Sequence, residues 1–225
     1  MEIISSAPGR ADFLNTHQDY KGLPVVPVAI NLRAYMLAKT IREKRFIIKA
    51  PDLERYNEPS LDEFKVGVNP ILEKGFFGNY FRGVVNVIAK MGLTEKLRGM
   101  EVTVRSNVPI GSGLASSAAI EVSFVELLNH VCKLGFSRKD IAEIAFTSEN
   151  REVGIPCGRL DQYSASFGGV IKLECRPPYN VETLPLKDLT FAIVDSGIRH
   201  STGDIHPKRQ NEINMALKAL MKLED

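Results

Sequence analysis

Residues 109–119 read Pro109-Ile110-Gly111-Ser112-Gly113-Leu114-Ala115-Ser116-Ser117-Ala118-Ala119, and this stretch decides the fold. The segment before it, 99–105, alternates apolar and polar residues, which is typical of a half-buried strand. The apolar segment after it, about 116–133, predicts a helix. Glycines let a backbone approach an anion closely, and a helix N-terminus offers unpaired N–H groups and a partial positive charge. The strand–loop–helix arrangement therefore predicts a phosphate cradle.

The loop differs from the two common phosphate-binding motifs. It is followed by no Gly-Lys-Ser/Thr sequence, and it does not match Gly-x-Gly-x-x-Gly. Residues 109–119 contain no lysine, so backbone N–H groups must carry the anion, with a cation supplied from elsewhere. Taken alone, the stretch has a structural alternative, an ordinary Gly/Ser turn that caps a helix.

Composition narrows the class of protein. A chain of 225 residues, 44% hydrophobic, suits one large domain or one domain plus part of another. The 29 basic and 27 acidic residues leave a formal charge of +2, so nothing argues for a nucleic-acid partner. No apolar run reaches the roughly 18 residues of a membrane span, and the N-terminus lacks signal-peptide features. We expect no membrane partner and a cytoplasmic protein.

The remaining patterns predict a mixed α+β fold. We expect strands at 24–40, 46–50, 169–174 and 190–195, helices at about 79–91, 137–152 and 207–223, and an irregular connection over 51–72. The helix that opens at Ser137 has Asp140 three residues on, a variant of the capping box. The three cysteines lack disulfide or metal spacing and are expected to be buried free thiols: Cys132, Cys157 and Cys175.

Residues 111–121 resemble the second motif of the GHMP kinases, Pro-x-x-x-Gly-Leu-x-Ser-Ser-Ala. The resemblance implies a GHMP kinase N-terminal domain (ribosomal protein S5 domain 2-like) over 1–178. A composition change near Cys175 suggests that the beginning of a second α+β domain occupies 179–225, where it would be truncated. In the family this loop holds the ATP phosphates, so the resemblance implies nucleotide contacts from Gly111, Ser112, Gly113, Leu114, Ala115, Ser116 and Ser117.

Two further segments are similar to the galactokinase branch of that family. Residues 7–20 match the signature Gly-Arg-x-Asn-x-x-Gly-Glu-His-x-Asp-Tyr at Gly9, Arg10, His17, Asp19 and Tyr20. Residues 149–162 resemble the stretch Glu…Gly-x-Pro-Cys-Gly-x-x-Asp-Gln at the same internal spacing. Residues 195–209 resemble a third family segment, so the likeness spans nearly the whole chain.

The resemblance implies a catalytic pair and a metal pair. Asp161 matches the family's catalytic aspartate, a base for the sugar's anomeric hydroxyl, and Arg10 matches the arginine beside it. An arginine this close would keep an aspartate ionised and stabilise transferred charge. Glu149 and Ser117 match the residues that hold Mg²⁺, whose preferred ligands are hard oxygens. The alternatives are a helix N-cap for Asp161, a surface charge for Arg10 and a solvated helix residue for Glu149.

The expected sugar contacts come from His17, Asp19, Gly158 and His206. Aspartate can accept hydrogen bonds from two ring hydroxyls, and imidazole can donate or accept one. The structural alternative for His17 is a satisfied loop histidine.

The chain departs from the galactokinase pattern on the sugar side. Asp12, Asn15 and Thr16 replace Asn, Gly and Glu of the signature, and His206 stands where a tyrosine is usual. Loss of a buried acceptor changes discrimination between hydroxyl patterns, so a pentose or a sugar acid is an alternative to D-galactose. The family's third, C-terminal glycine-rich motif is absent, and we expect a missing C-terminal half as a partner.

These patterns predict ATP-dependent phosphorylation of a sugar at its anomeric hydroxyl. The alternatives are a non-catalytic sugar- and ATP-binding module, an incomplete kinase fragment, or a kinase for another small molecule. The presence of both Arg10 and Asp161 favours the enzyme, because a sensor could lose either one.

Overall fold

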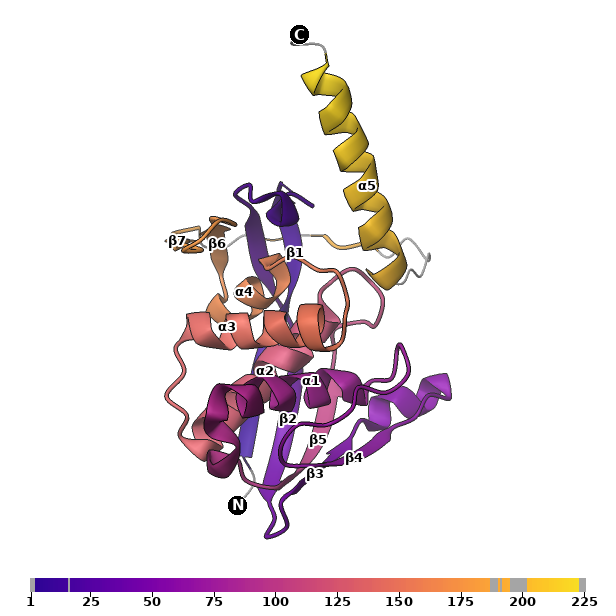
Figure 1. Cartoon of the computed structure of the whole chain (residues 1–225), viewed down its shortest axis with the longest axis vertical. Coiled ribbons are helices and arrows are strands. Elements are labelled where there is room, and N and C mark those ends of the chain that lie inside the picture. The colour runs from indigo at the N-terminus through magenta and orange to yellow at the C-terminus, as the bar shows by residue number, and fades with distance from the viewer. Residues whose placement is uncertain (1–2, 16, 187–189, 191, 195–201, 223–225) are drawn as a thin grey trace.

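The computed structural model describes the chain except residues 1–2, 16, 187–189, 191, 195–201 and 223–225 (Figure 1). For residues 3 and 202–206 it describes the backbone alone.

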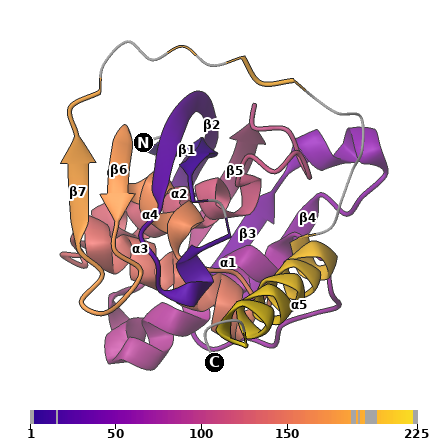
Figure 2. The same ribbon diagram turned by 90° about the horizontal axis from the view of Figure 1, so that it is seen from above.

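One sheet runs through the molecule. Its strands are β1 (Ile3–Leu14), β2 (Val26–Thr40), β3 (Arg45–Lys49), β4 (Leu61–Lys65), β5 (Met100–Ser106), β6 (Val170–Leu173) and β7 (Val181–Leu184). Their order is β4-β3-β5-β2-β6-β7, and β1 pairs with β2 (Figure 2). Strands β3 and β5 pair in parallel, and the other pairings between these strands are antiparallel.

The α-helices are α1 (Gly78–Ile88), α2 (Ser116–Cys132), α3 (Arg138–Thr147), α4 (Leu160–Phe167) and α5 (Thr202–Met221). Helices α1, α2 and α4 pack against the sheet, α3 packs on these three helices, and a fifth helix extends away from the sheet (Figures 1 and 2). Helix α5 contacts the rest of the chain where Lys21 donates to Asn214 and Gln210 donates to the carbonyl of Pro156. Single helical turns occupy Asp19–Lys21, Pro51–Tyr56, Ala89–Leu93, Thr94–Lys96 and Ser148–Glu152.

The core lies between the sheet and helices α1 to α3. In β5, Met100, Val102 and Val104 are buried while the residues between them are not, as the alternation predicts. Rings from three elements meet edge to face: Phe124 of α2 lies 5.8 Å from Phe46 of β3 and 5.0 Å from Phe81 of α1. This packing holds α2, and therefore the loop before it, in a fixed position.

A buried ion pair ties β4 to α1. Asp62 and Arg82 are 6% and 7% exposed, and the guanidinium donates to both carboxylate oxygens at 2.9 and 2.7 Å. The guanidinium also donates to the carbonyls of Pro70 and Glu63. Every charge here has a partner, which is the condition for burying a pair at small cost.

The mixed α+β prediction is confirmed, and most predicted elements occur near their predicted positions. The capping box at Ser137 is present, with the Ser137 and Asp140 side chains bonded to each other's backbone N–H. All three cysteines are buried and free.

Some local predictions were wrong. The segment 51–72 was expected to be irregular but contains strand β4. This strand was missed because it buries Asp62 and exposes Leu61, so its sequence lacks the usual alternation of apolar and polar residues. Strands β1 and β7 and helix α4 were not predicted. Of the strand expected near 190–195, residues 190 and 192–194 form no strand, and the others lie outside the described residues. The domain boundary at residue 178 stays a prediction, although β7 beyond it pairs with β6.

Candidate active site

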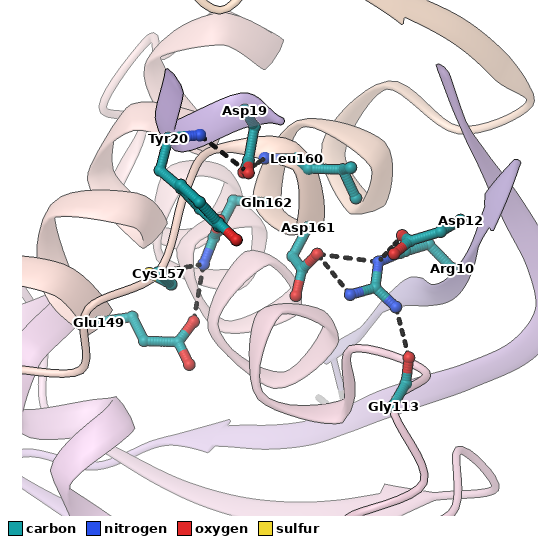
Figure 3. A network of polar contacts seen from close by, with 10 residues as sticks. All are labelled: Arg10, Asp12, Asp19, Tyr20, Gly113, Glu149, Cys157, Leu160, Asp161 and Gln162. Carbon is teal, nitrogen blue, oxygen red and sulfur yellow. Dashed lines mark hydrogen bonds and ion pairs between the residues drawn. The ribbon is translucent and has the colours of Figure 1, made fainter. Parts of the chain in front are cut away.

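Arg10, on β1, joins two segments that are distant in sequence. Its Nε and Nη2 contact Oδ1 of Asp161 at 2.8 and 2.6 Å, and its Nη1 donates to the carbonyl of Gly113 (Figure 3). Asp12 supplies a second carboxylate 3.1 Å from Nε. Burial alone would lower the pKa of Arg10, but the charges of Asp161 and Asp12 raise it above its ordinary value. The cation expected near the Gly-rich loop is therefore Arg10.

Asp161 is the second residue of α4, and its side chain is 21% exposed. Both contacts from Arg10 go to Oδ1, and no described residue donates a hydrogen bond to Oδ2. The carboxylate is thus held in place while one oxygen stays available. The alternative role of helix N-cap is wrong, because Arg159 occupies that position.

Asp19 joins the single turn Asp19–Lys21 to α4. Its Oδ2 accepts from the N–H of Leu160 at 3.2 Å, and its Oδ1 accepts from the N–H of Tyr20 at 2.9 Å. A Cβ on Gly158 would lie 1.7 Å from Oδ2 of Asp19, so the close approach requires glycine. Burial raises the pKa of Asp19, and the charge of Asp161 adds to this effect.

A small cavity of about 30 Å³ brings the predicted residues together. Its lining is Arg10, Asp12, His17, Asp19, Tyr20, Cys157, Gly158, Leu160 and Asp161. His17 has a left-handed backbone (φ 62°), and its ring centroid lies 6.1 Å from that of Tyr20. The space admits water-sized groups such as a hydroxyl.

The Gly-rich loop has the backbone that an anion site needs. Gly111, Gly113 and Ala115 adopt positive φ values of 67°, 75° and 57°. Ala115 is the N-cap of α2, and no side chain caps that end of the helix. The first N–H groups of α2 therefore lack the partner that a Ser or Asp cap would supply. The N–H of Arg10 donates to the carbonyl of Leu114 at 3.1 Å, which fixes the loop against β1.

Glu149 and Ser117 also meet. Glu149 is 3% exposed, and its Oε2 accepts from Nε2 of Gln162 at 2.7 Å. The Ser117 hydroxyl lies within hydrogen-bonding reach of the same carboxyl. Burial, with the charge of Asp161, raises the pKa of Glu149 to about 7. The alternative of a solvated Glu149 is therefore wrong.

Comparison with known protein families identifies two segments of the chain. Residues 79–169 match the GHMP kinases N terminal domain, and residues 1–40 match the galactokinase galactose-binding signature. Residues 79–169 therefore carry the N-terminal domain of the GHMP kinases. Among curated relatives, galactokinases of Actinobacillus succinogenes and Thermococcus kodakarensis are 32% and 34% identical, over 91% and 96% of this chain. The chain covers 53% and 60% of their lengths.

Solved structures share the fold. Lactococcus lactis galactokinase, solved with galactose, aligns over 100% of this chain and 58% of its own at a TM-score of 0.78 and 24% identity. Methanococcus jannaschii mevalonate kinase aligns over 83% of this chain and 56% of its own, with a TM-score of 0.65 and 17% identity. Both support the GHMP kinase architecture.

Two residues that depart from the galactokinase pattern on the sugar side have no described side chain. Thr16 is among the residues left out, and His206 belongs to α5 by its backbone alone. The remaining predicted residues of the GHMP kinase domain lie around Arg10, the loop and the start of α4. Across the described part of the chain, no three His, Cys, Asp or Glu residues form a metal-binding group, and no helix could span a membrane.

Sequence reasoning missed several members of the GHMP kinase site. Asp12 is a partner of Arg10, Gln162 holds Glu149, and Glu121 is wholly buried beside it. The available signal for Glu121 was its place as the one charged residue in the largely apolar stretch 118–125. Within the described residues, Tyr20 Oη, Glu121 Oε2 and Gln162 Oε1 are buried without hydrogen-bond partners. Such atoms are rare in folded proteins, and two more occur in the described chain, Nε of Arg45 on β3 and Oγ of Ser164 on α4.

Proposed function

We propose that this chain supplies the sugar-binding and catalytic residues of an ATP-dependent sugar kinase of the galactokinase type, which phosphorylates the anomeric hydroxyl. The observation that carries the proposal is the contact of one guanidinium, Arg10, with both Asp161 and Gly113. Through this side chain, the proposed base Asp161 and the proposed phosphate-binding loop lie next to each other. The chain spans about half the length of the curated relatives it matches, so the activity of the whole kinase is part of the proposal.

Asp161 acts on the acceptor sugar. Oδ1 is held by Arg10, so Oδ2 takes the proton from the anomeric hydroxyl as that oxygen attacks the terminal phosphorus of ATP. The bond between this phosphorus and the oxygen it shares with ADP breaks, and ADP leaves with the electron pair. Arg10 stabilises the charge that moves in this step.

The loop and the head of α2 hold the phosphates. Positive φ values at Gly111, Gly113 and Ala115 turn backbone N–H groups toward one side, and the uncapped first turn of α2 adds its own. The residues fit a magnesium ion, because Ser117 and Glu149 present hard oxygens beside each other at this end of α2. Mg²⁺ would neutralise phosphate charge during transfer.

The sugar contacts come from the cavity beside Asp161. The cavity admits water-sized groups and does not enclose a whole sugar ring, so the ring lies across the mouth with a hydroxyl inside. Asp19, fixed by two backbone N–H groups, accepts from ring hydroxyls, and His17 lines the same space. A C-terminal half is the expected partner that completes the nucleotide site.

Measurement of ADP release over a sugar panel tests the proposal. We expect release that requires both a sugar and Mg²⁺, and its loss in Asp161→Asn with sugar and nucleotide binding retained. Binding without release, in the presence of a C-terminal half supplied from a relative, would favour the non-catalytic module instead.

The same panel tests specificity. Asp12, Thr16 and His206 depart from the galactokinase pattern, so we expect a preference other than D-galactose among galactose, galacturonate, arabinose and N-acetylgalactosamine. Galactose far ahead of the other three would contradict this part of the proposal.

A further inference from the structure

Glu121 lies in the interior of α2, one helical turn beyond Ser117. Residues four apart share a helix face, so Glu121 is directly below the serine at the head of the helix. Its side chain is 0% exposed. Oε1 accepts from the hydroxyl of Ser148 at 2.8 Å, whereas Oε2 receives no hydrogen bond from any described residue.

The carboxyl of Glu149 lies within hydrogen-bonding reach of the carboxyl of Glu121. Ionised carboxylates only accept hydrogen bonds, so two of them in contact offer each other no donor. No lysine or arginine of the described chain pairs with either one; Ser148 donates to Glu121, and the hydrogen-bond partners of Glu149 are Ser117, Glu121 and Gln162.

Such an arrangement costs folding free energy. A buried carboxyl without a cation is expensive, and an apolar or amide side chain of similar size would avoid the cost. The fold has no need of a carboxylate at residue 121, since the neighbouring helix positions are filled by apolar side chains such as Ala118, Val122 and Val125. A group that destabilises the free protein is expected to contribute when a ligand is bound.

We propose that Glu121 is a positioning residue for a divalent cation held by Ser117 and Glu149. Glu149 contacts Ser117 on one side and Glu121 on the other, so Glu121 supports the ligand carboxylate from behind. The hydroxyl of Ser148 donates to Glu121 and so orients it, and Ser148 directly precedes Glu149 in the chain. The inference rests on the proposed function insofar as the cation is the one that accompanies the nucleotide.

The test compares two glutamate-to-glutamine changes on the same helix. Glu121→Gln removes the buried carboxylate, while Glu126→Gln makes the same change at a partly exposed position five residues on. Mn²⁺ binding to the full chain is followed by electron paramagnetic resonance, with and without ATP, and thermal unfolding is recorded with and without Mn²⁺. Glu149→Gln provides the background without the ligand carboxylate.

We expect Glu121→Gln to unfold at or above the wild-type temperature and to bind Mn²⁺ tenfold to a hundredfold more weakly. Glu126→Gln should match the wild type in both measurements. Wild-type Mn²⁺ affinity in Glu121→Gln overturns the proposal, and so does a wild-type chain that binds Mn²⁺ no better than Glu149→Gln. A lower unfolding temperature with unchanged Mn²⁺ affinity would give Glu121 a structural role only.

If Glu121→Gln does not fold, Ser148→Ala tests the proposal instead. This change removes the hydrogen bond to Oε1 of Glu121 and keeps the carboxyls of Glu121 and Glu149. Weaker Mn²⁺ binding in that variant supports the proposal, and unchanged binding overturns it. The Mn²⁺ result can be separated from the test of the proposed kinase activity. Mn²⁺ binding that depends on Glu121 in a chain without sugar-dependent ADP release contradicts the proposed function and leaves this inference standing.

Discussion

Two pairs of buried ionisable residues lie in the same core, and they differ in the partner that each carboxyl faces. Asp62 faces Arg82, which donates to both of its oxygens, so charge and hydrogen bonds are complete. Glu121 faces Glu149, and no cation among the described residues approaches either one. A pair whose charges and hydrogen bonds are all matched is buried at small cost, whereas an unmatched pair would gain from a bound ligand. The difference separates structural charge from functional charge in this molecule.

The largest effect should come from the functional side. Asp161→Asn removes the base, so we expect sugar-dependent ADP release to fall by a factor of about 10² to 10⁴. Unfolding temperature and nucleotide binding should stay near wild type, because Asn can still accept from Arg10. Asp52→Asn, a partly exposed aspartate paired with Arg105, is the matched control. Equal turnover in both variants would remove Asp161 from the chemistry.

The structural side predicts a loss of stability. Arg82→Met leaves Asp62 buried and unpaired, which should cost about 3–5 kcal/mol in the free energy of unfolding. Urea denaturation measures it. The double variant Asp62→Leu with Arg82→Met should recover most of the loss, since it removes both charges. If Arg82→Met lowers the free energy of unfolding by less than about 1 kcal/mol, Asp62 is tolerated without its cation, and the contrast between the two pairs does not hold.

A smaller steric effect is expected at the cavity. Gly158→Ala puts a Cβ against Oδ2 of Asp19, and we expect a cost of about 1–3 kcal/mol with weakened sugar binding. In an Asp19→Ala background the obstructing carboxylate is gone, so the same change should cost much less. A double-mutant cycle by chemical denaturation measures this coupling. Equal costs in the two backgrounds would contradict the contact.

The smallest effect is a pH dependence from Asp19. Burial raises its pKa in the folded chain, so the folded state holds this proton more tightly than the unfolded state. Its stabilising contribution is therefore complete below about pH 4, the unfolded pKa, and is lost as pH rises through the folded pKa. The stability of wild type minus that of Asp19→Asn should fall as the pH rises above about 4. A difference that rises over this range would reverse the sign we assign.

Local patterns sufficed for the elements whose residues carry their own signals. The alternation in 99–105 and the capping pair Ser137 and Asp140 depend on neighbours in the chain, so strand β5 and the start of α3 were predictable. Strand β4 was not, because Asp62 turns inward toward a partner twenty residues away. Its burial makes sense only once Arg82 is beside it.

The site divides in the same way. The sequence by itself determined the Gly-rich loop, the helix after it and the residue types that match the galactokinase signature, because these depend on short-range backbone preferences and on motif spacing. Only the tertiary structure decided that Arg10 bridges Asp161 and Gly113, 151 and 103 residues away, and that Glu121 touches Glu149. Those contacts arise because β1, α2 and α4 pack around one core, and no local preference specifies which distant side chains that packing brings together.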